Sequence, residues 1–371
     1  KERLEMLKMK EEECKKYGYE FNGRLDFWDL KYYMNQVEVT RFAVDQEELK
    51  PYFPVEVVTK ELLAVYQELL QLQFTQVKGD TWHPDVVLYQ VNDAGNNELL
   101  GYFFMDLFPR EGKFGHAAVF PLQPSCLDDG EKRQVAVVAL MVNFPRPCGD
   151  KPCLLDHKEV ETFFHEFGHV MHQICSRAQR AFFSGTSVER DFVEAPSQML
   201  ENWVWEGDIL RRLSCHYQTK EPLSQNVIDK LVKSKNANTA HFNLRQIVLA
   251  TFDQVIHTSS QADTKKVFSN LFSDILGVET IPGTNMPASF GHVASGYDAQ
   301  YYGYLWSEVY SIDMFSTEFE KKGVMDKNTG KKYRTCILEP GGSIDAIDML
   351  RNFLGREPNS DAFLKSKGIY E

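Results

Sequence analysis

The stretch TFFHEFGHVMHQ, residues 162–173, holds three histidines and one glutamate within eight positions. His165 and His169 are four residues apart, so on a helix they project from one face, about 6 Å apart along the axis. Both imidazoles can then bind one ion, and zinc takes imidazole nitrogens at about 2.0–2.1 Å. Glu166 follows the first histidine and would lie beside the ion, where it can accept a proton from water. The stretch therefore predicts a helix with a zinc-dependent hydrolytic site, although ordinary buried helices also place two histidines on one face.

The residues around this motif support the same interpretation. Asp156 followed by Glu159 is typical of a capping box and predicts that the helix begins there. Gly168 would allow another backbone segment to approach closely beside the second histidine. A dry surround would come from three aromatic residues, Phe163, Phe164 and Phe167.

A catalytic zinc ion needs a third protein ligand and an open fourth position. The continuation HExxHxxGxxH does not apply, because residue 172 is His rather than Gly and residue 175 is Cys rather than His. His172 shares the face of His165 but lies about 7–8 Å along the helix from an ion held by the first two histidines. That distance is too long for ligation, so we expect His172 to pack in the interior or to support a ligand.

The segment RDFVEAPSQMLEN, residues 190–202, offers three carboxylates for the third position. Glu194 lies in the first turn of the expected helix and is the favoured ligand. Glu201, two turns deeper, is the alternative, and otherwise would be a surface carboxylate or one that supports a ligand. Asp191 is expected to cap the helix.

Composition limits the class of protein. The chain has 371 residues, of which 43% are apolar and 25% charged, which is ordinary for a globular protein. A formal net charge of −12 argues against nonspecific nucleic-acid binding, and no apolar run is long enough to cross a membrane. Seven scattered cysteines indicate free thiols in a reducing compartment, so we predict a cytoplasmic location. Cys148 and Cys153 share one loop, and no second Cys/His pair completes a metal site there.

The pattern of apolar residues predicts a mostly α fold with a small antiparallel β-sheet. Residues 1–80 form a helical segment, 81–150 the sheet, and 151–371 a helical region with the zinc site and a long loop. The last predicted strand, VAVVALMVNF, is almost wholly apolar and is expected in the sheet interior. The chain starts with Lys1 inside a charged helical pattern, so we expect a fragment that starts within a longer protein.

These motifs together resemble those of the thimet oligopeptidase/neurolysin family of zinc oligopeptidases. The resemblance is carried by HEFGHVMHQ, FSGTSVERDFVEAPSQMLENWVWE, NLRQIVLA, PGTNMPASFGHVASGYDAQYYGYLWSEVYS and EPGGS. It implies a zincin-like, neurolysin-like catalytic lobe with one zinc ion per chain, short peptides as substrates and a helical N-terminal lobe outside this sequence. It also implies His165, His169 and Glu194 as zinc ligands and Glu166 as the general base, in agreement with their spacing.

The resemblance assigns a second group of residues to the substrate. It implies Tyr304 as a donor to the oxyanion and Tyr297 and His292 as groups that orient the substrate. Tyrosine hydroxyls and imidazole N–H groups can stabilise the negative charge that grows on a carbonyl oxygen under attack. Without the resemblance, YDAQYYGY would be a tyrosine-rich helix start in the core.

Tyr301 and the loop glycines Gly291 and Gly296 are also expected to contact substrate. GHVASGYD has Ser295 where the family pattern GHLAGGYD has a second glycine. Because glycine is the most flexible residue, we expect this serine to stiffen the loop without abolishing its function.

The sequence thus predicts a zinc endopeptidase that hydrolyses internal bonds of short peptides. By analogy with other zincin-like proteases, GHAAVF at 115–120 is expected to be an edge strand that pairs with the substrate backbone, and its His116 to be structural. Two alternatives stay open: a protein or half-enzyme that binds zinc and peptide without cleavage, and a helical scaffold without metal.

Overall fold

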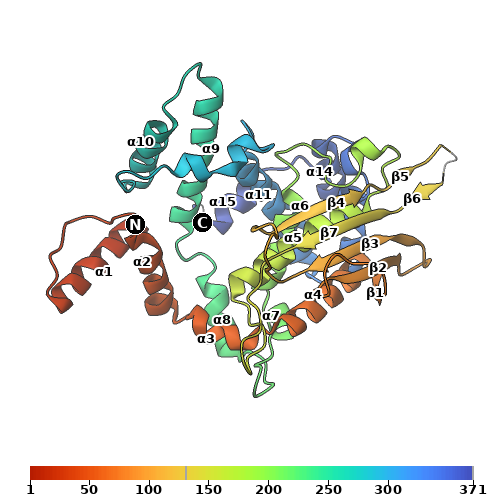
Figure 1. The fold of residues 1–371 in the computed structure, drawn as a ribbon, viewed down its shortest axis with the longest axis horizontal. Helices are drawn as coiled ribbons and strands as arrows, with labels where there is room; N and C mark the ends of the chain where they lie inside the picture. Colours follow the sequence, from red (N-terminus) through yellow and green to blue (C-terminus); the bar gives the residue numbers. More distant parts are fainter. Residues whose placement is uncertain (130–131, 370–371) are drawn as a thin grey trace. The chain divides into compact units, whose positions relative to one another are not determined.

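The computed structural model describes residues 1–129 and 132–369. The chain divides into two compact units, one made of Lys1–Asp45, Asp229–Trp306 and Lys367–Glu371, the other of Gln46–Ile228 and Ser307–Ser366. Helices predominate, with one five-stranded sheet in the second unit (Figure 1), so the prediction of a mostly helical fold is confirmed. Each unit takes segments from distant parts of the sequence.

The sheet is mixed, and the prediction of an antiparallel sheet is wrong at one pair of strands. Its order is β1-β2-β3-β7-β4, and β3 pairs with β7 in parallel, with Gly101 opposite Ala136. The other three pairs are antiparallel. β7 is interior, as expected, because β3 and β4 flank it. The strands are β1 (Leu72–Val77), β2 (Val87–Asp93), β3 (Leu99–Asp106), β4 (Ala118–Gln123) and β7 (Ala136–Met141), and a separate hairpin joins β5 (Cys126–Leu127) to β6 (Arg133–Gln134).

Strand β1 lies inside the segment that the sequence predicted to be helical. Helix α4 (Val55–Leu70) ends at Gln71, whose φ of 54° is left-handed. The side-chain oxygen of Gln67 then accepts a hydrogen bond from the N–H of Phe74 at 2.6 Å. The apolar period of the helix continues into the strand, so the sequence pattern does not mark this boundary.

The second unit contains most of the helices. From Ala195 to Leu213 the chain forms α6, a 3₁₀ turn at Asn202–Trp205 and α7. The α-helices of this unit are α3 (Gln46–Leu49), α4, α5 (His157–Cys175), α6 (Ala195–Glu201), α7 (Gly207–Leu213), α12 (Glu320–Lys322), α13 (Lys327–Tyr333), α14 (Ala346–Leu354) and α15 (Asp361–Ser366). Two further helices, α8 (Gln225–Ser234) and α11 (Gly303–Met314), continue from one unit into the other.

Helix α5 packs against β3, β7 and β4 (Figure 1) and is fixed there by a cap and by aromatic contacts. The predicted capping box is confirmed, because Asp156 accepts from the Glu159 N–H at 2.8 Å and Glu159 accepts from the Asp156 N–H at 2.9 Å. Phe167 is fully buried and meets the ring of Phe103 on β3 edge-on at 5.3 Å. The histidine motif therefore lies on a capped helix whose other side packs into the core of the unit.

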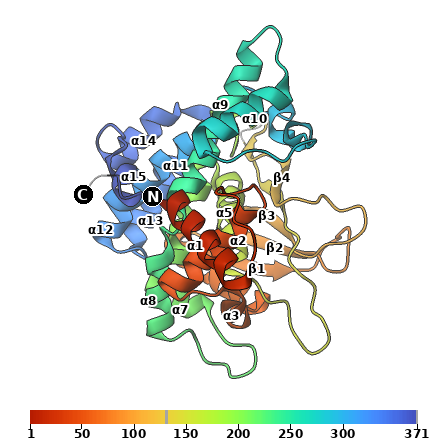
Figure 2. The ribbon, with the colours of Figure 1, turned by 90° about the vertical axis from the view of Figure 1, so that its left-hand side faces the viewer.

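The first unit is helical. Helices α1 (Glu2–Tyr17), α2 (Asp29–Val37), α9 (Thr239–Thr258) and α10 (Thr264–Leu276) share one apolar core, and α9 and α10 lie side by side (Figure 2). A long loop follows α10 and contains two 3₁₀ turns, Met286–Ser289 and Gly291–Ala294. Helix α11 begins at Gly303, after this loop.

Two observations concern the chain as a whole. None of the helices in the described residues is long and apolar enough to cross a membrane. The seven cysteines are free thiols, and Cys148 is exposed while Cys153 is buried.

Candidate metal centre

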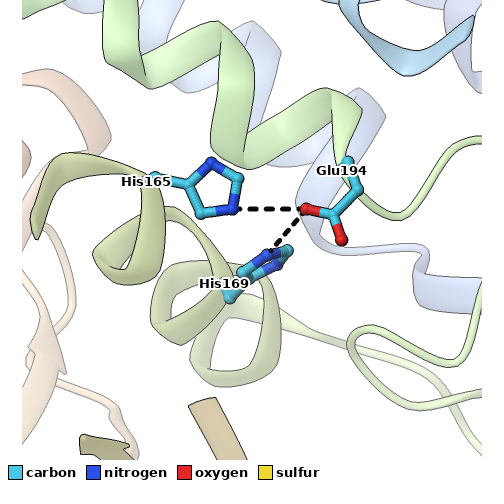
Figure 3. Close-up of side chains that lie close together, drawn as sticks. All are labelled: His165, His169 and Glu194. Carbon is cyan, nitrogen blue, oxygen red and sulfur yellow. Dashed lines mark hydrogen bonds and ion pairs between the residues drawn. The ribbon is translucent and has the colours of Figure 1, made fainter. Parts of the chain in front are cut away.

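Helix α5 and the start of α6 bring together the three predicted ligands, His165, His169 and Glu194. The carboxylate oxygen Oε2 of Glu194 lies 3.2 Å from Nε2 of His165 and 3.1 Å from Nε2 of His169 (Figure 3). The three candidate donor atoms all lie within 4.8 Å of one another. The two histidines come from successive turns of one helix, and Glu194 reaches them from the N-cap position of the next.

Gly168 allows this approach of the two helices. A Cβ atom at position 168 would lie 2.8 Å from the Cα of Ser197 on α6. This contact is shorter than a real side chain tolerates, so glycine is required if α6 is to pack here. The close backbone approach predicted beside the second histidine is confirmed.

Glu201 supports His165 from the side opposite the donor group. Its Oε1 lies 2.6 Å from Nδ1 of His165. An imidazole that donates from Nδ1 presents the lone pair of Nε2, and a carboxylate partner makes that nitrogen a stronger ligand. Glu194 therefore faces Nε2 of His165, and Glu201 faces Nδ1 of the same ring. The two carboxylates that the sequence left as alternatives for the third ligand thus occupy different positions around His165.

Asp191 does not cap α6, and this prediction is wrong. Glu194 occupies the N-cap position, and the carbonyl of Asp191 accepts a hydrogen bond from the hydroxyl of Ser307 at 2.7 Å. A short turn precedes α6, so the helix begins later than the apolar pattern indicated.

The charges of the donor group favour an ionised carboxylate beside the imidazoles. Burial opposes ionisation of Glu194, but the charges and hydrogen bonds of His169 and His165 outweigh it and hold its pKa well below the ordinary value. Burial likewise opposes protonation of His165, but Glu194 and Glu201 raise the pKa of its imidazole well above the ordinary value. A bound divalent cation would replace the imidazole protons as the positive charge beside these carboxylates.

Glu166 differs from the two other carboxylates. It is buried, 7% exposed, and burial raises its pKa above the ordinary value, while His165 and His169 partly counteract the rise. A carboxylate whose pKa is shifted toward neutrality can accept a proton and return it in the same catalytic cycle.

The donor group fits zinc. Four ligands at about 2.0–2.1 Å in a tetrahedron lie about 3.4 Å apart, close to the 3.1 and 3.2 Å between the carboxylate oxygen and the two imidazole nitrogens. Two imidazoles and one carboxylate form the donor set typical of a hydrolytic zinc site, with one position left for water or substrate. The chain therefore has a candidate zinc site with the three predicted ligands.

The predicted substrate residues form a second cluster, which lies in the first unit. The ring of His292 lies 5.6 Å from that of Tyr297, 5.4 Å from Tyr301 and 5.8 Å from Tyr304. Tyr297 and Tyr304 stack at 5.1 Å, and Tyr301 is the most buried of the three at 7% exposed. The structure thus brings these four side chains together.

The loop glycines differ in what they contribute to this cluster. Gly296 has a φ of 96°, a conformation that favours glycine, whereas Gly291 opens a 3₁₀ turn. The hydroxyl of Ser295 donates to the carbonyl of Gly291 at 2.8 Å. This bond closes the turn, which is consistent with the stiffening expected from the serine.

Comparison with known proteins decides the family. The sequence model of peptidase family M3 matches residues 1–369 of this chain. The chain belongs to peptidase family M3. It is 46% identical over 350 residues to a thimet-like oligopeptidase of Dictyostelium discoideum, covering 92% of this chain and 52% of that protein. It is 40% identical over 375 residues to saccharolysin of Saccharomyces cerevisiae, covering 97% and 52%. The corresponding values for oligopeptidase A of Escherichia coli are 38% over 349 residues, 92% and 51%.

This member of family M3 spans about half the length of the curated relatives that it matches. Among solved structures it resembles a carboxypeptidase from Pyrococcus furiosus, with a TM-score of 0.54, 12% identity, and coverage of 91% of this chain and 63% of that one. It also resembles PZ peptidase A, with a TM-score of 0.51, 13% identity, and coverage of 93% and 58%. Because the sequence identities are this low, the structural similarity shows a shared fold alone.

Within the M3 fold, His172 and the predicted edge strand take the places that the sequence indicated. His172 is fully buried, lies outside the donor group, and neither ring nitrogen has a hydrogen-bond partner in the described part of the chain. Strand β4 is an edge of the sheet next to α5, but it begins at residue 118 rather than 115. His116 therefore precedes the strand, where its ring contacts Phe114 at 5.6 Å.

Asp253 of this M3 chain holds the backbone of the tyrosine segment and is not recognisable from the sequence pattern. The residue is fully buried in α9, and its carboxylate accepts hydrogen bonds from the N–H groups of Ala299 and Tyr301. The available signal was a single acidic residue inside the apolar stretch IVLATFDQVI. The partners lie more than 40 positions away, at a separation of 46 and 48 residues, so no local pattern points to them.

Proposed function

We propose that this chain carries the zinc site of a metalloendopeptidase that hydrolyses internal bonds of short peptides. The observation that carries the proposal is the convergence of His165, His169 and Glu194 beside a buried glutamate, in a member of peptidase family M3. Relatives named thimet-like oligopeptidase and oligopeptidase A support short peptides as the substrate class.

His165, His169 and Glu194 would hold the zinc ion. When bound, zinc would supply Lewis-acid chemistry, polarising a carbonyl and making water more acidic. Glu166 would accept a proton at its carboxylate from the attacking water and deliver it to the nitrogen of the leaving amine. Its burial and its raised pKa suit both transfers, because a carboxylate with a raised pKa binds the proton more tightly than an ordinary one.

The aromatic cluster would act on the substrate in this proposal. Tyr304 would donate a hydrogen bond from its hydroxyl to the carbonyl oxygen as negative charge develops there. Tyr297 and His292 would orient the peptide, and Tyr301, Gly291 and Gly296 would contact it. These roles come from the family resemblance and are supported by the mutual packing of the four aromatic rings.

Strand β4 is the candidate surface for binding the substrate backbone beside the site. The edge strand β4 would pair with an extended peptide backbone, because an edge strand has free hydrogen-bonding groups along one side. A cytoplasmic location and a helical N-terminal lobe that completes the peptide-binding channel remain predictions.

The proposal is tested with an internally quenched fluorogenic peptide of about ten residues. We expect turnover that a chelator abolishes and added zinc restores. Glu166→Gln should lower kcat by about 100-fold to 10,000-fold, the range of general acid–base catalysis, while the protein still binds one zinc ion. Mass spectrometry of the products should show cleavage at an internal bond.

Glu56→Gln on α4 is the matched control, because it makes the same chemical change at an exposed position. It should leave kcat within twofold of the wild type. Peptide and zinc binding without turnover would support the alternative of a protein that binds peptide but does not cleave it. A chain that takes up no zinc would exclude both functions.

A further inference from the structure

We propose that Asp253 and Gln254 form a backbone clamp that positions the tyrosine segment Tyr297–Tyr304 for catalysis, an inference that rests on the function proposed above. The two residues are adjacent on α9, and both reach the same point of the chain, Ala299. Neither residue belongs to the metal-ligand group or to the aromatic cluster. They would act through the backbone that carries the tyrosines, as positioning residues.

The clamp consists of three hydrogen bonds. Asp253 accepts from the N–H of Ala299 through Oδ1 at 3.0 Å and from the N–H of Tyr301 through Oδ2 at 2.9 Å. The side-chain amide of Gln254 donates to the carbonyl of Ala299 at 2.7 Å. Both backbone groups of Ala299 are therefore held by one turn of α9.

Ala299 needs such support because its backbone is left-handed, with a φ of 58°. This conformation is unfavourable for a residue with a Cβ atom and persists where the surroundings enforce it. A buried carboxylate that accepts two N–H groups provides strong hydrogen bonds, because one partner is charged. We infer that the clamp determines the backbone turn that precedes α11.

Asp253 has a third polar neighbour within the same unit. Its side chain is fully buried, and Nδ1 of His257, one helical turn further along α9, lies 2.8 Å from Oδ1. The same nitrogen lies 2.9 Å from the backbone carbonyl of Asp253. The carboxylate is thus surrounded by three N–H donors, two from the tyrosine segment and one from the helix that holds it.

The clamped turn is connected directly to the aromatic cluster. Tyr301 donates one hydrogen bond of the clamp from its N–H, and its ring contacts Phe290 at 5.0 Å, Tyr304 at 5.1 Å and His292 at 5.4 Å. A shift of the backbone at residues 299–301 would therefore move several of the rings proposed to act on substrate. Displacements of about 1 Å at a catalytic group can lower a rate about 100-fold.

The test compares Asp253→Asn with the wild type in steady-state kinetics, zinc content and amide hydrogen exchange. The two N–H groups bond to different oxygens of Asp253, and asparagine replaces one of these oxygens with an NH2 group, which donates and cannot accept. We expect kcat on the fluorogenic peptide to fall about 10-fold to 100-fold, KM to change less than threefold, and bound zinc to stay at one per chain. Amide hydrogen exchange in residues 297–304 should become at least tenfold faster, a readout that does not depend on activity.

A second substitution separates positioning from a general structural role. Glycine adopts a left-handed backbone without strain, so Ala299→Gly added to Asp253→Asn should restore kcat at least fivefold. Asp274→Asn on α10 is the control, because it removes a negative charge at an exposed position of the same unit. It should leave kcat and exchange at 297–304 within twofold of the wild type.

A kcat for Asp253→Asn within twofold of the wild type would overturn the inference, and so would unchanged exchange at 297–304. If Asp253→Asn does not fold, Gln254→Glu replaces the donor amide with an acceptor and should lower kcat about 3-fold to 10-fold. An unchanged kcat in that variant would also overturn the clamp. Faster exchange in Asp253→Asn, combined with a wild type that shows no turnover, would support the clamp and contradict the proposed peptidase function.

Discussion

At the residue scale, helix α5 buries histidines in two different environments. His165 has a carboxylate on each ring nitrogen, Glu201 at Nδ1 and Glu194 at Nε2, and it is partly accessible at 18% of its side chain. His172, seven residues later, has no exposed surface and no polar partner in the described residues. The first environment favours the imidazolium or a bound cation, and the second favours the neutral ring.

This difference predicts a specific pH dependence of stability. Burial, with a smaller contribution from the charge of His169, lowers the pKa of His172 to about 3 from its ordinary value of 6.5. In the unfolded chain His172 therefore binds a proton below about pH 6.5, whereas in the folded chain it binds one only below about pH 3. Stability from the neutral ring is complete above pH 6.5 and is lost as the pH falls, by about 1.4 kcal/mol per pH unit.

The measurement is urea unfolding of the metal-free protein, wild type against His172→Leu, at pH 7 and at pH 5. Leucine has a similar volume and no proton to bind, so the variant should gain about 2 kcal/mol relative to the wild type between the two values. If the unfolding free energies of the two proteins change equally between pH 7 and pH 5, His172 is protonated in the folded state at pH 5. A chelator is present throughout, because zinc binding has its own pH dependence.

At the element scale, predictions succeeded where the information is local. The α5 helix was predicted with its start, its cap and its dry face, because capping residues and apolar period lie within 20 positions of each other. The parallel pairing of β3 with β7 was not predicted, because β4 lies between them in the sequence but at the edge of the sheet. The strand β1 was missed for a related reason, since the residue that ends α4 is an ordinary glutamine in a left-handed conformation.

The candidate site shows the same limit. The spacing of His165, Glu166 and His169 predicts one face of one helix, and Glu194 follows from the short distance to the next helix. The role of Glu201 was left open because its partner depends on how α6 packs against α5. The clamp at Ala299 depends on contacts between segments 46 residues apart, which no local window contains.

The packing of α6 against α5 at Gly168 should determine both the stability of the fold and the affinity for zinc. Gly168→Ala would place a Cβ atom 2.8 Å from the Cα of Ser197, so the two helices must separate. We expect a loss of about 1–3 kcal/mol of unfolding free energy, typical of overpacking. Zinc affinity should also fall, because Glu194 at the start of α6 would move away from His169.

The two effects are measured by urea unfolding without metal and by zinc titration against a competing chelator dye. Gly115→Ala is the control, because a Cβ atom there meets nothing within 4 Å. It should change neither quantity by more than about 0.5 kcal/mol. Unaltered zinc affinity in Gly168→Ala would mean that the position of Glu194 does not depend on this helix contact.

At the scale of the whole molecule, the chemistry divides between two compact units. The candidate zinc ligands and the sheet belong to the unit with α5 and α6, and the aromatic cluster with its proposed clamp belongs to the unit with α9 and α10. Each unit has its own buried core. Binding energy from the metal should therefore be concentrated in the unit that supplies the ligands.

Removal of zinc tests this division. If zinc binds with a Kd of about 1 nM, about 10 μM free zinc would stabilise the folded protein by about 5 kcal/mol, and a chelator would remove that stabilisation. The three ligands join α5 to α6, so zinc should slow amide hydrogen exchange most in residues 157–175 and 194–201. Helices α9 and α10 of the other unit serve as an internal reference and should change less. Glu194→Ala is the matched variant, and it should lose most of the zinc-dependent protection. Equal protection of both units in the wild type would show that the metal stabilises the molecule as one cooperative body.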